Sequence, residues 1–137
     1  MLEIEGLRFA MAHISWPWCD ELIAVYGKFL HALDKNGSRG VELFIDVTPG
    51  TPAIYRRDAL TKLFTVGYDV AQNVIFGTDC NANNYNGGWT RQWIERDTAI
   101  YQDLGLGRQT VDNIFCGNLK RFIEGKPVEK QTLRPGE

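Results

Sequence analysis

Three short apolar runs, each followed by a segment of helical periodicity, constrain the fold of this chain more than any other feature. The runs cover residues 7–15, 41–47 and 73–79, and each is short, apolar and rich in β-branched and aromatic residues, as buried strands are. Apolar residues recur at helical spacing across 20–35, and a second helical segment begins at Pro52, with Thr51 as its expected N-cap. Strands joined by helical crossovers pair in parallel, so the sequence predicts an α/β fold with about three parallel strands and outer helices.

The second half of the chain continues with a polar loop and several helices. An asparagine- and glycine-rich stretch follows residue 79 and predicts an irregular loop at the edge of the sheet. Helices are expected over 89–104 and 109–115, and a last one is expected to be capped by Asn118 and to end at Gly125. We therefore expect one domain over residues 1–125 and a polar, disordered or loosely docked tail over 126–137.

Composition excludes several classes of partner. The chain has 137 residues and a net charge of −2, with none of the basic stripes that nucleic-acid binding needs. Its apolar runs are far too short to span a membrane, and acidic residues rather than a secretory leader follow Met1. The three cysteines form no CxxC pair, which favours reduced thiols in a cytoplasmic protein over a disulfide or a zinc–thiolate site.

Two of the apolar runs end on residues whose side chains can bind a metal or transfer a proton. His13 lies near the end of the first run and Asp79 at the end of the third. Because the carboxyl ends of parallel strands meet at one edge of a sheet, the two side chains are expected at the same edge. A histidine and an aspartate at one edge suggest a metal-assisted hydrolytic site. Two alternatives stay open: Asp79 as a cap of the following loop, and His13 as a buried, hydrogen-bonded structural residue.

Strand alternation indicates how the neighbouring residues are placed. It puts Phe9, Met11 and His13 on one face of the first strand. Trp16 and Trp18 follow directly and are candidates for the apolar wall of a substrate pocket, or equally for a lid over the sheet edge. Structural roles are expected for three further residues, namely hydrogen bonding for Asp46, packing for Cys80 and a solvated helix face for His31.

Four segments carry a resemblance to a known family. They are LRFAMAHIS at 7–15, VELFIDV at 41–47, IFGTDC at 75–80 and NIFCGNLKRFI at 113–123. In this order and spacing the chain resembles the C-terminal part of the amidohydrolase superfamily, in the branch of aminocarboxymuconate-semialdehyde decarboxylase and related enzymes. The resemblance implies a partial (β/α)8 TIM barrel, in which the three runs are the sixth, seventh and eighth strands. It also implies a divalent metal, usually zinc, at the carboxyl-end rim.

The resemblance also implies roles for the two candidate residues. Asp79 matches the aspartate that binds the metal and handles the proton of the attacking water, and His13 matches the histidine that polarises or protonates the substrate. The family's HxH pair and its fifth-strand histidine have no counterpart here. The chain corresponds to roughly the last third to half of a barrel that takes about 250 residues.

Two functions follow as hypotheses. The first is the C-terminal part of a metal-dependent hydrolase or non-oxidative decarboxylase acting on a small carboxylated or cyclic substrate. The second is a non-catalytic barrel fragment that self-associates through exposed strand edges and an uncovered apolar inner face. The expected protein partner is accordingly a second copy of the chain, in a homo-oligomer, or a complementing barrel half.

Overall fold

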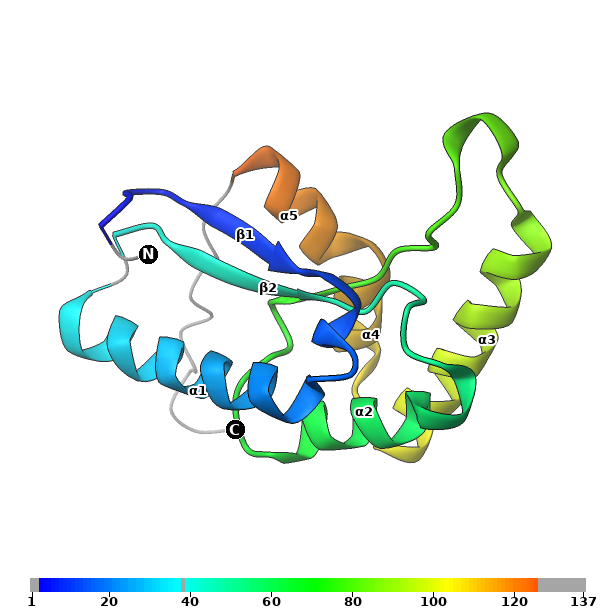
Figure 1. Ribbon diagram of the computed structural model, residues 1–137, viewed down its shortest axis with the longest axis horizontal. Helices are drawn as coiled ribbons and strands as arrows, with labels where there is room; N and C mark the ends of the chain where they lie inside the picture. Colours follow the sequence, from blue (N-terminus) through cyan, green and yellow to red (C-terminus); the bar gives the residue numbers. More distant parts are fainter. Residues whose placement is uncertain (1–2, 38, 126–137) are drawn as a thin grey trace.

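The computed structural model describes residues 3–37 and 39–125 and has mixed α/β architecture, mostly helical, around one small sheet (Figure 1). Along the chain the elements are β1 (Arg8–Met11), η1 (Ala12–Ser15), α1 (Cys19–Asn36), β2 (Glu42–Asp46), α2 (Ala53–Thr65), β3 (Val74–Ile75), η2 (Ala82–Asn84), α3 (Gly87–Asp103), α4 (Arg108–Asp112), η3 (Asn113–Gly117) and α5 (Asn118–Glu124).

The three predicted strands form a parallel sheet in the order β1-β2-β3. Arg8 lies opposite Glu42, and Ile45 lies opposite Val74. This confirms the parallel sheet, but β3 is much shorter than the predicted 73–79. The amide of Phe76 donates to the carbonyl of Ile114 at 3.0 Å, so the backbone leaves the sheet at that point and pairs with η3 instead.

One face of the sheet forms the main hydrophobic core. Leu43, Ile45 and Val47 alternate onto this face and are completely buried with residues of α1 and α2. Figure 1 shows both helices on the same side of the strands. Alternation along β2 therefore gives this side of the sheet its apolar contacts, as the sequence predicted.

The opposite face of the sheet is covered at β2, which corrects the expectation of a bare inner face. Phe44 is fully buried, and its ring meets that of Phe122 in α5 edge-to-face at 5.1 Å. The guanidinium of Arg121 lies 4.7 Å from the centre of the Phe44 ring and pairs with Glu42 on the same strand face. Figure 1 places α5 across the sheet from α1 and α2. The sheet thus has helices on both faces.

The first strand is also shorter than predicted, and this changes the placement of His13. The extended backbone ends at Met11, and His13, Ile14 and Ser15 all adopt positive φ angles of 54°, 49° and 55°. Because the chain turns here, the strand alternation that grouped His13 with Phe9 and Met11 does not reach it. Ile14 is completely buried and fixes this turn to the core.

Two predicted helix caps are wrong and one helix end is confirmed. Pro52 rather than Thr51 occupies the N-cap of α2, and Thr51 is buried with its hydroxyl 3.5 Å from the carbonyl of His13. Asn118 does not cap a helix, because the π-helical turn η3 leads directly into α5. Its buried amide donates instead to the carbonyls of Ala71 and Val74, at 2.9 and 2.8 Å. Gly125 ends α5 in the left-handed conformation, as predicted.

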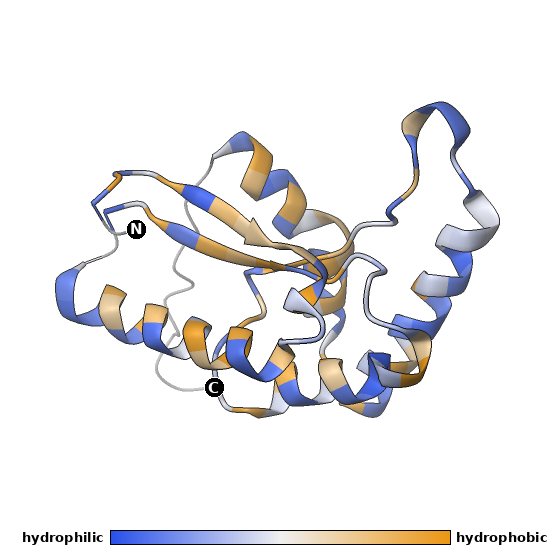
Figure 2. Cartoon of the chain, in the orientation of Figure 1, coloured by the Kyte–Doolittle hydropathy of each residue, from blue (hydrophilic) through white to orange (hydrophobic). Residues whose placement is uncertain are grey.

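Hydropathy follows this architecture. Apolar residues run along β1 and β2, whereas the loop from β3 to α3 is largely hydrophilic (Figure 2). Across residues 3–37 and 39–125, no helix is both long and apolar enough to cross a membrane. Cys19, Cys80 and Cys116 are all free. The predicted tail at 126–137 lies outside the described residues.

Candidate functional site

The carboxyl ends of the three strands bring the candidate residues to one edge of the sheet, which we call the rim. His13 follows β1 within η1, Thr48 follows β2, and Asp79 lies four residues after Ile75, the last residue of β3. Parallel pairing in the order β1-β2-β3 makes β2 the neighbour of both other strands. The sequence-predicted pair therefore occupies the two outer positions of the rim, with the loop after β2 between them.

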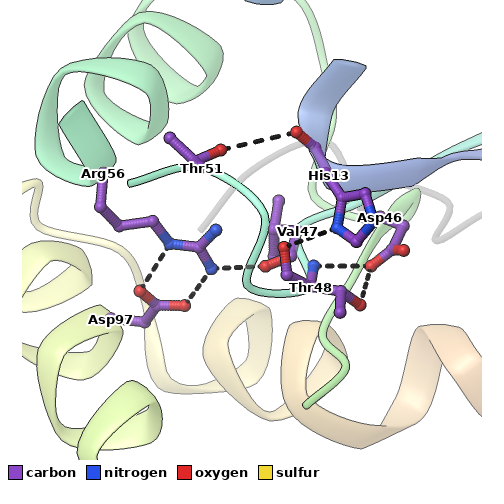
Figure 3. Close-up of polar contacts among 7 residues, drawn as sticks. All are labelled: His13, Asp46, Val47, Thr48, Thr51, Arg56 and Asp97. Carbon is purple, nitrogen blue, oxygen red and sulfur yellow. Dashed lines mark hydrogen bonds and ion pairs between the residues drawn. The ribbon is translucent and has the colours of Figure 1, made fainter. Parts of the chain in front are cut away.

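His13 is half-buried and is held by the loop that follows β2. Its Nδ1 lies 3.3 Å from the carbonyl oxygen of Thr48 (Figure 3). A carbonyl only accepts, so Nδ1 carries the proton and donates, which leaves Nε2 for other chemistry. Gly50 lies directly against the ring, where a Cβ would overlap the imidazole. The predicted hydrogen-bonded structural role thus accounts for one ring nitrogen and leaves the other free to act.

Asp46 fixes the residue that holds His13. Its Oδ1 accepts from the backbone N–H of Thr48 at 2.7 Å and also from the Thr48 hydroxyl. Gly77, from the segment after β3, lies so close to that hydroxyl that a Cβ would overlap it. Asp46 therefore has the hydrogen-bonding role expected from the sequence, and the three rim segments contact one another through Thr48.

Asp79 is exposed and has a left-handed backbone, with φ of 55°. It does not cap the loop that follows. Thr78 accepts from the Cys80 amide at 3.4 Å, and Asn81 accepts from the Asn83 amide at 2.8 Å. No residue of the described ranges forms a hydrogen bond or ion pair with the Asp79 carboxylate. The carboxylate is consequently available to a ligand.

Cys80 is half-buried beside Asp79 and points toward backbone rather than into a core. Its sulfur lies 3.6 Å from the carbonyl of Thr78 and 4.0 Å from that of Asn86. Hydrogen bonding with the Asn86 backbone, assisted by Thr78 and Thr90, lowers the pKa of the Cys80 thiol. The packing role expected from the sequence is replaced by polar contacts at the base of the long loop.

The described residues do not complete a metal site by themselves. No group of three or more histidine, cysteine, aspartate or glutamate side chains comes together within 3–37 and 39–125. A catalytic zinc site normally takes three protein ligands and leaves one position open. The candidate donors at the rim are His13 and Asp79, two in number, while His31 is exposed on α1.

The two tryptophans after His13 have different surroundings. Trp16 is half-buried and stacks on Tyr55 of α2, with ring centres 4.8 Å apart and planes at 25°. Together with Asp58 and Lys62 they line a cleft of about 230 Å³. Trp18 is 64% exposed and does not line this cleft. Of the two predicted substrate-binding residues, Trp16 lines this cleft and Trp18 does not.

A buried ion pair behind the rim was missed by the sequence analysis. Arg56 Nε and Nη2 donate to the two carboxylate oxygens of Asp97 at 3.0 and 2.6 Å, and both side chains are almost completely buried (Figure 3). Nη2 also donates to the carbonyl of Val47 at 2.5 Å. The pair joins α2 and α3 to the end of β2. Its sequence signal is a charged residue at helical spacing with Ala59, Leu60 and Leu63, the buried positions of α2.

Comparison of the chain with models of known protein families, with curated proteins and with solved structures finds no match.

Proposed function

We propose that this chain is part of a metal-dependent hydrolase or non-oxidative decarboxylase, and that it contributes the last strands of a (β/α)8 TIM barrel. Three parallel strands, with His13 and Asp79 after the first and third, suit the last strands of such a barrel. Closure of the barrel would require α5 to leave the inner face of β2, where it covers Phe44. The remaining metal ligands come from residues beyond the described ranges, in the same or another polypeptide.

The observation that carries the proposal is the hydrogen bond from His13 to Thr48. A histidine that acts in catalysis or binds a metal commonly donates its second ring N–H to a carbonyl, which fixes the tautomer. The Nδ1 of His13 does this at 3.3 Å, supported by Asp46 through Thr48. Its Nε2 then accepts a proton, or donates one to a substrate oxygen when the ring is charged.

Asp79 supplies the second functional group of the proposed site. It lies after a strand end, adopts a left-handed backbone and has no partner among the described side chains. An unpaired carboxylate at a rim takes a proton from a reacting water or binds a cation. Trp16, three residues after His13, stacks on Tyr55, and this aromatic pair suits a small cyclic substrate.

Elemental analysis of the purified protein tests this proposal. The chain should be prepared without chelator or histidine tag, and zinc per chain should be measured together with the mass in solution. Because the described residues offer two ligands, we expect stoichiometric zinc only where a second copy or a complementing barrel half supplies the rest, and little or none in the chain alone. That zinc should be removed by Asp79→Asn and left in place by His31→Gln, a change of the exposed helix histidine. Stoichiometric zinc that Asp79→Asn leaves in place would refute the proposed role of Asp79, and absence of zinc from every oligomer would refute the metal site.

A second candidate function, self-association of a non-catalytic domain, is favoured by the open edge of the sheet. Within the described residues β1 pairs only with β2, so the other edge of the four-residue strand Arg8–Met11 has unpaired backbone groups. This function predicts an oligomer whose mass rises with concentration and does not change with chelator. Sedimentation at several concentrations, with and without EDTA, separates it from zinc-dependent assembly.

A further inference from the structure

A second cleft lies on the other side of the loop that follows β2, and neither candidate function uses it. It has a volume of about 350 Å³ and lies between that loop and α3. We call it the tryptophan cleft, and its lining residues are Pro49, Gly50, Thr51, Pro52, Ala53, Trp89, Gln92, Trp93 and Arg96. Its volume is at the lower end of the range for small-molecule sites.

The charges around the tryptophan cleft favour an anion. None of its lining residues is acidic, and Arg96 is the one charged residue among them. The Arg96 guanidinium is half-buried, 4.5 Å from the centre of the Trp93 ring, and pairs with no carboxylate within the described ranges. Arg56 lies 5.2 Å from the same ring but is neutralised by Asp97. Arg96 therefore leaves an uncompensated positive charge at the cleft.

The first turn of α2 adds hydrogen-bond donors to the same wall. Pro52 and Ala53 line the cleft at the start of this 13-residue helix. The helix has no side-chain cap and no acidic residue in its first turn. The Tyr55 N–H donates to the Pro52 carbonyl at 2.9 Å, which leaves the N–H groups before it and the positive end of the helix dipole uncompensated. These donors favour a negative group at this end of the cleft.

The two tryptophans give the cleft an apolar wall in which Trp89 is the more exposed ring. Trp93 is buried and Trp89 is 40% exposed, with ring centres 5.5 Å apart at 68°. The indole N–H of Trp89 donates to the carbonyl of Thr78 at 3.0 Å, which fixes the orientation of the ring. A flat ligand ring stacks well on the face of Trp89, whereas the Trp93 ring is already covered by Arg96. The wall therefore suits the apolar body of a ligand whose charge faces Arg96.

We propose that the tryptophan cleft binds a small anion in which a carboxylate or phosphate is attached to a flat ring. The oxyanion is bound by Arg96 and the first turn of α2, and the ring packs on Trp89. Arginine binds a carboxylate or a phosphate equally through two parallel N–H donors. The cleft is therefore expected to recognise any planar molecule that carries one of these two groups at its end. This inference does not depend on a metal at the rim.

NMR of the indole N–H groups tests the proposal directly. The chain contains four tryptophans, so four indole signals can be assigned with single Trp→Phe variants. Benzoate and phenyl phosphate are titrated separately, with neutral benzamide as the matched uncharged ligand. We expect saturable shifts of the Trp89 and Trp93 signals with at least one of the two anions, and the tighter of them identifies the preferred oxyanion.

Two arginine variants distinguish specific anion binding in the tryptophan cleft from general electrostatic attraction to the protein. Arg96→Gln is expected to weaken anion binding at least about tenfold, which is the scale of a charge-assisted hydrogen bond. Arg91→Gln removes an exposed charge from the same helix outside the cleft and is expected to leave the affinity unchanged. Absence of saturable shifts in the wild-type chain would overturn the proposal. So would equally tight binding of benzamide, or equal loss in both variants.

Discussion

Replacing Asp97 by asparagine should destabilise the protein strongly. The carboxylate is completely buried and accepts two bonds from Arg56, which is also completely buried and holds the Val47 carbonyl. Removing one charge leaves the guanidinium buried without its counterion, which costs about 3–5 kcal/mol. A domain of this size has a free energy of unfolding of about 5–15 kcal/mol, so the loss would be a large part of the total.

Urea denaturation followed by circular dichroism measures this loss, and an exposed ion pair provides the control. Arg57 and Asp103 join the same two helices at 2.8 Å, but their side chains are 58% and 61% exposed. Asp103→Asn should therefore change the free energy of unfolding by no more than about 1 kcal/mol. A loss below about 1 kcal/mol for Asp97→Asn, or equal losses in the two variants, would refute the structural role assigned to the buried pair.

Four further predictions test the packing of the rim and the buried tyrosines of the core. Gly50→Ala should lower the free energy of unfolding by about 1–3 kcal/mol and shift the His13 NMR signals, because the added methyl group overlaps the imidazole. Gly87→Ala, with open space around it, should leave the stability unchanged. Equal losses of stability in the two variants would contradict the contact between Gly50 and His13. Tyr101→Phe should be neutral or stabilising in thermal unfolding, because its buried hydroxyl has no partner within the described ranges. Tyr26→Phe should cost about 1 kcal/mol, because that hydroxyl donates to the Asp69 carbonyl; the reverse order would contradict the hydrogen-bond assignment. Burial raises the pKa of Tyr26, so the folded state favours the neutral phenol. The free energy of unfolding should therefore fall as pH rises above about 10, the usual pKa of tyrosine. This fall should be less steep in Tyr26→Phe than in the wild type.

The sequence predicted the elements well where periodicity decides the structure. The parallel sheet and the helices α1, α2 and α3 follow from runs of alternating or helically spaced apolar residues. The observed bounds of α1 and α3 lie within about two residues of the expected ones, and α2 begins directly after the predicted Pro52. Gly125 ends α5 as expected because a residue without a Cβ enters the left-handed conformation at little cost.

Prediction failed where tertiary contacts override the local pattern. The apolar run at 7–15 continues past the end of β1, but burial of Ile14 turns the chain through three left-handed residues. Asn118 resembles a helix cap locally, yet its amide is used by the carbonyls of Ala71 and Val74, far away in the sequence. The cover that α5 provides over Phe44 is equally non-local.

In the candidate site, too, the sequence predicted what depends on local pattern and missed what depends on contacts between distant segments. The sequence placed His13 and Asp79 at the ends of two strands, whereas in the structure they lie two residues after Met11 and four residues after Ile75, at the same edge of the sheet. It gave no indication that the carbonyl of Thr48 would hold the imidazole, because that contact depends on how the loop after β2 folds over η1. Arg56 and Asp97 were missed because they are 41 residues apart and pair only after α2 and α3 pack together.

The most direct test of the central claim asks whether His13 and Asp79 belong to one site. The imidazole signals of His13 should be followed by NMR while zinc is added to the wild-type chain, to Asp79→Asn and to Asp69→Asn, a loop carboxylate beside a different segment. The account predicts a zinc-dependent shift of His13 that Asp79→Asn abolishes and Asp69→Asn preserves. If the His13 signals do not change when zinc is added, or if they shift equally in Asp79→Asn, the two residues do not belong to one site.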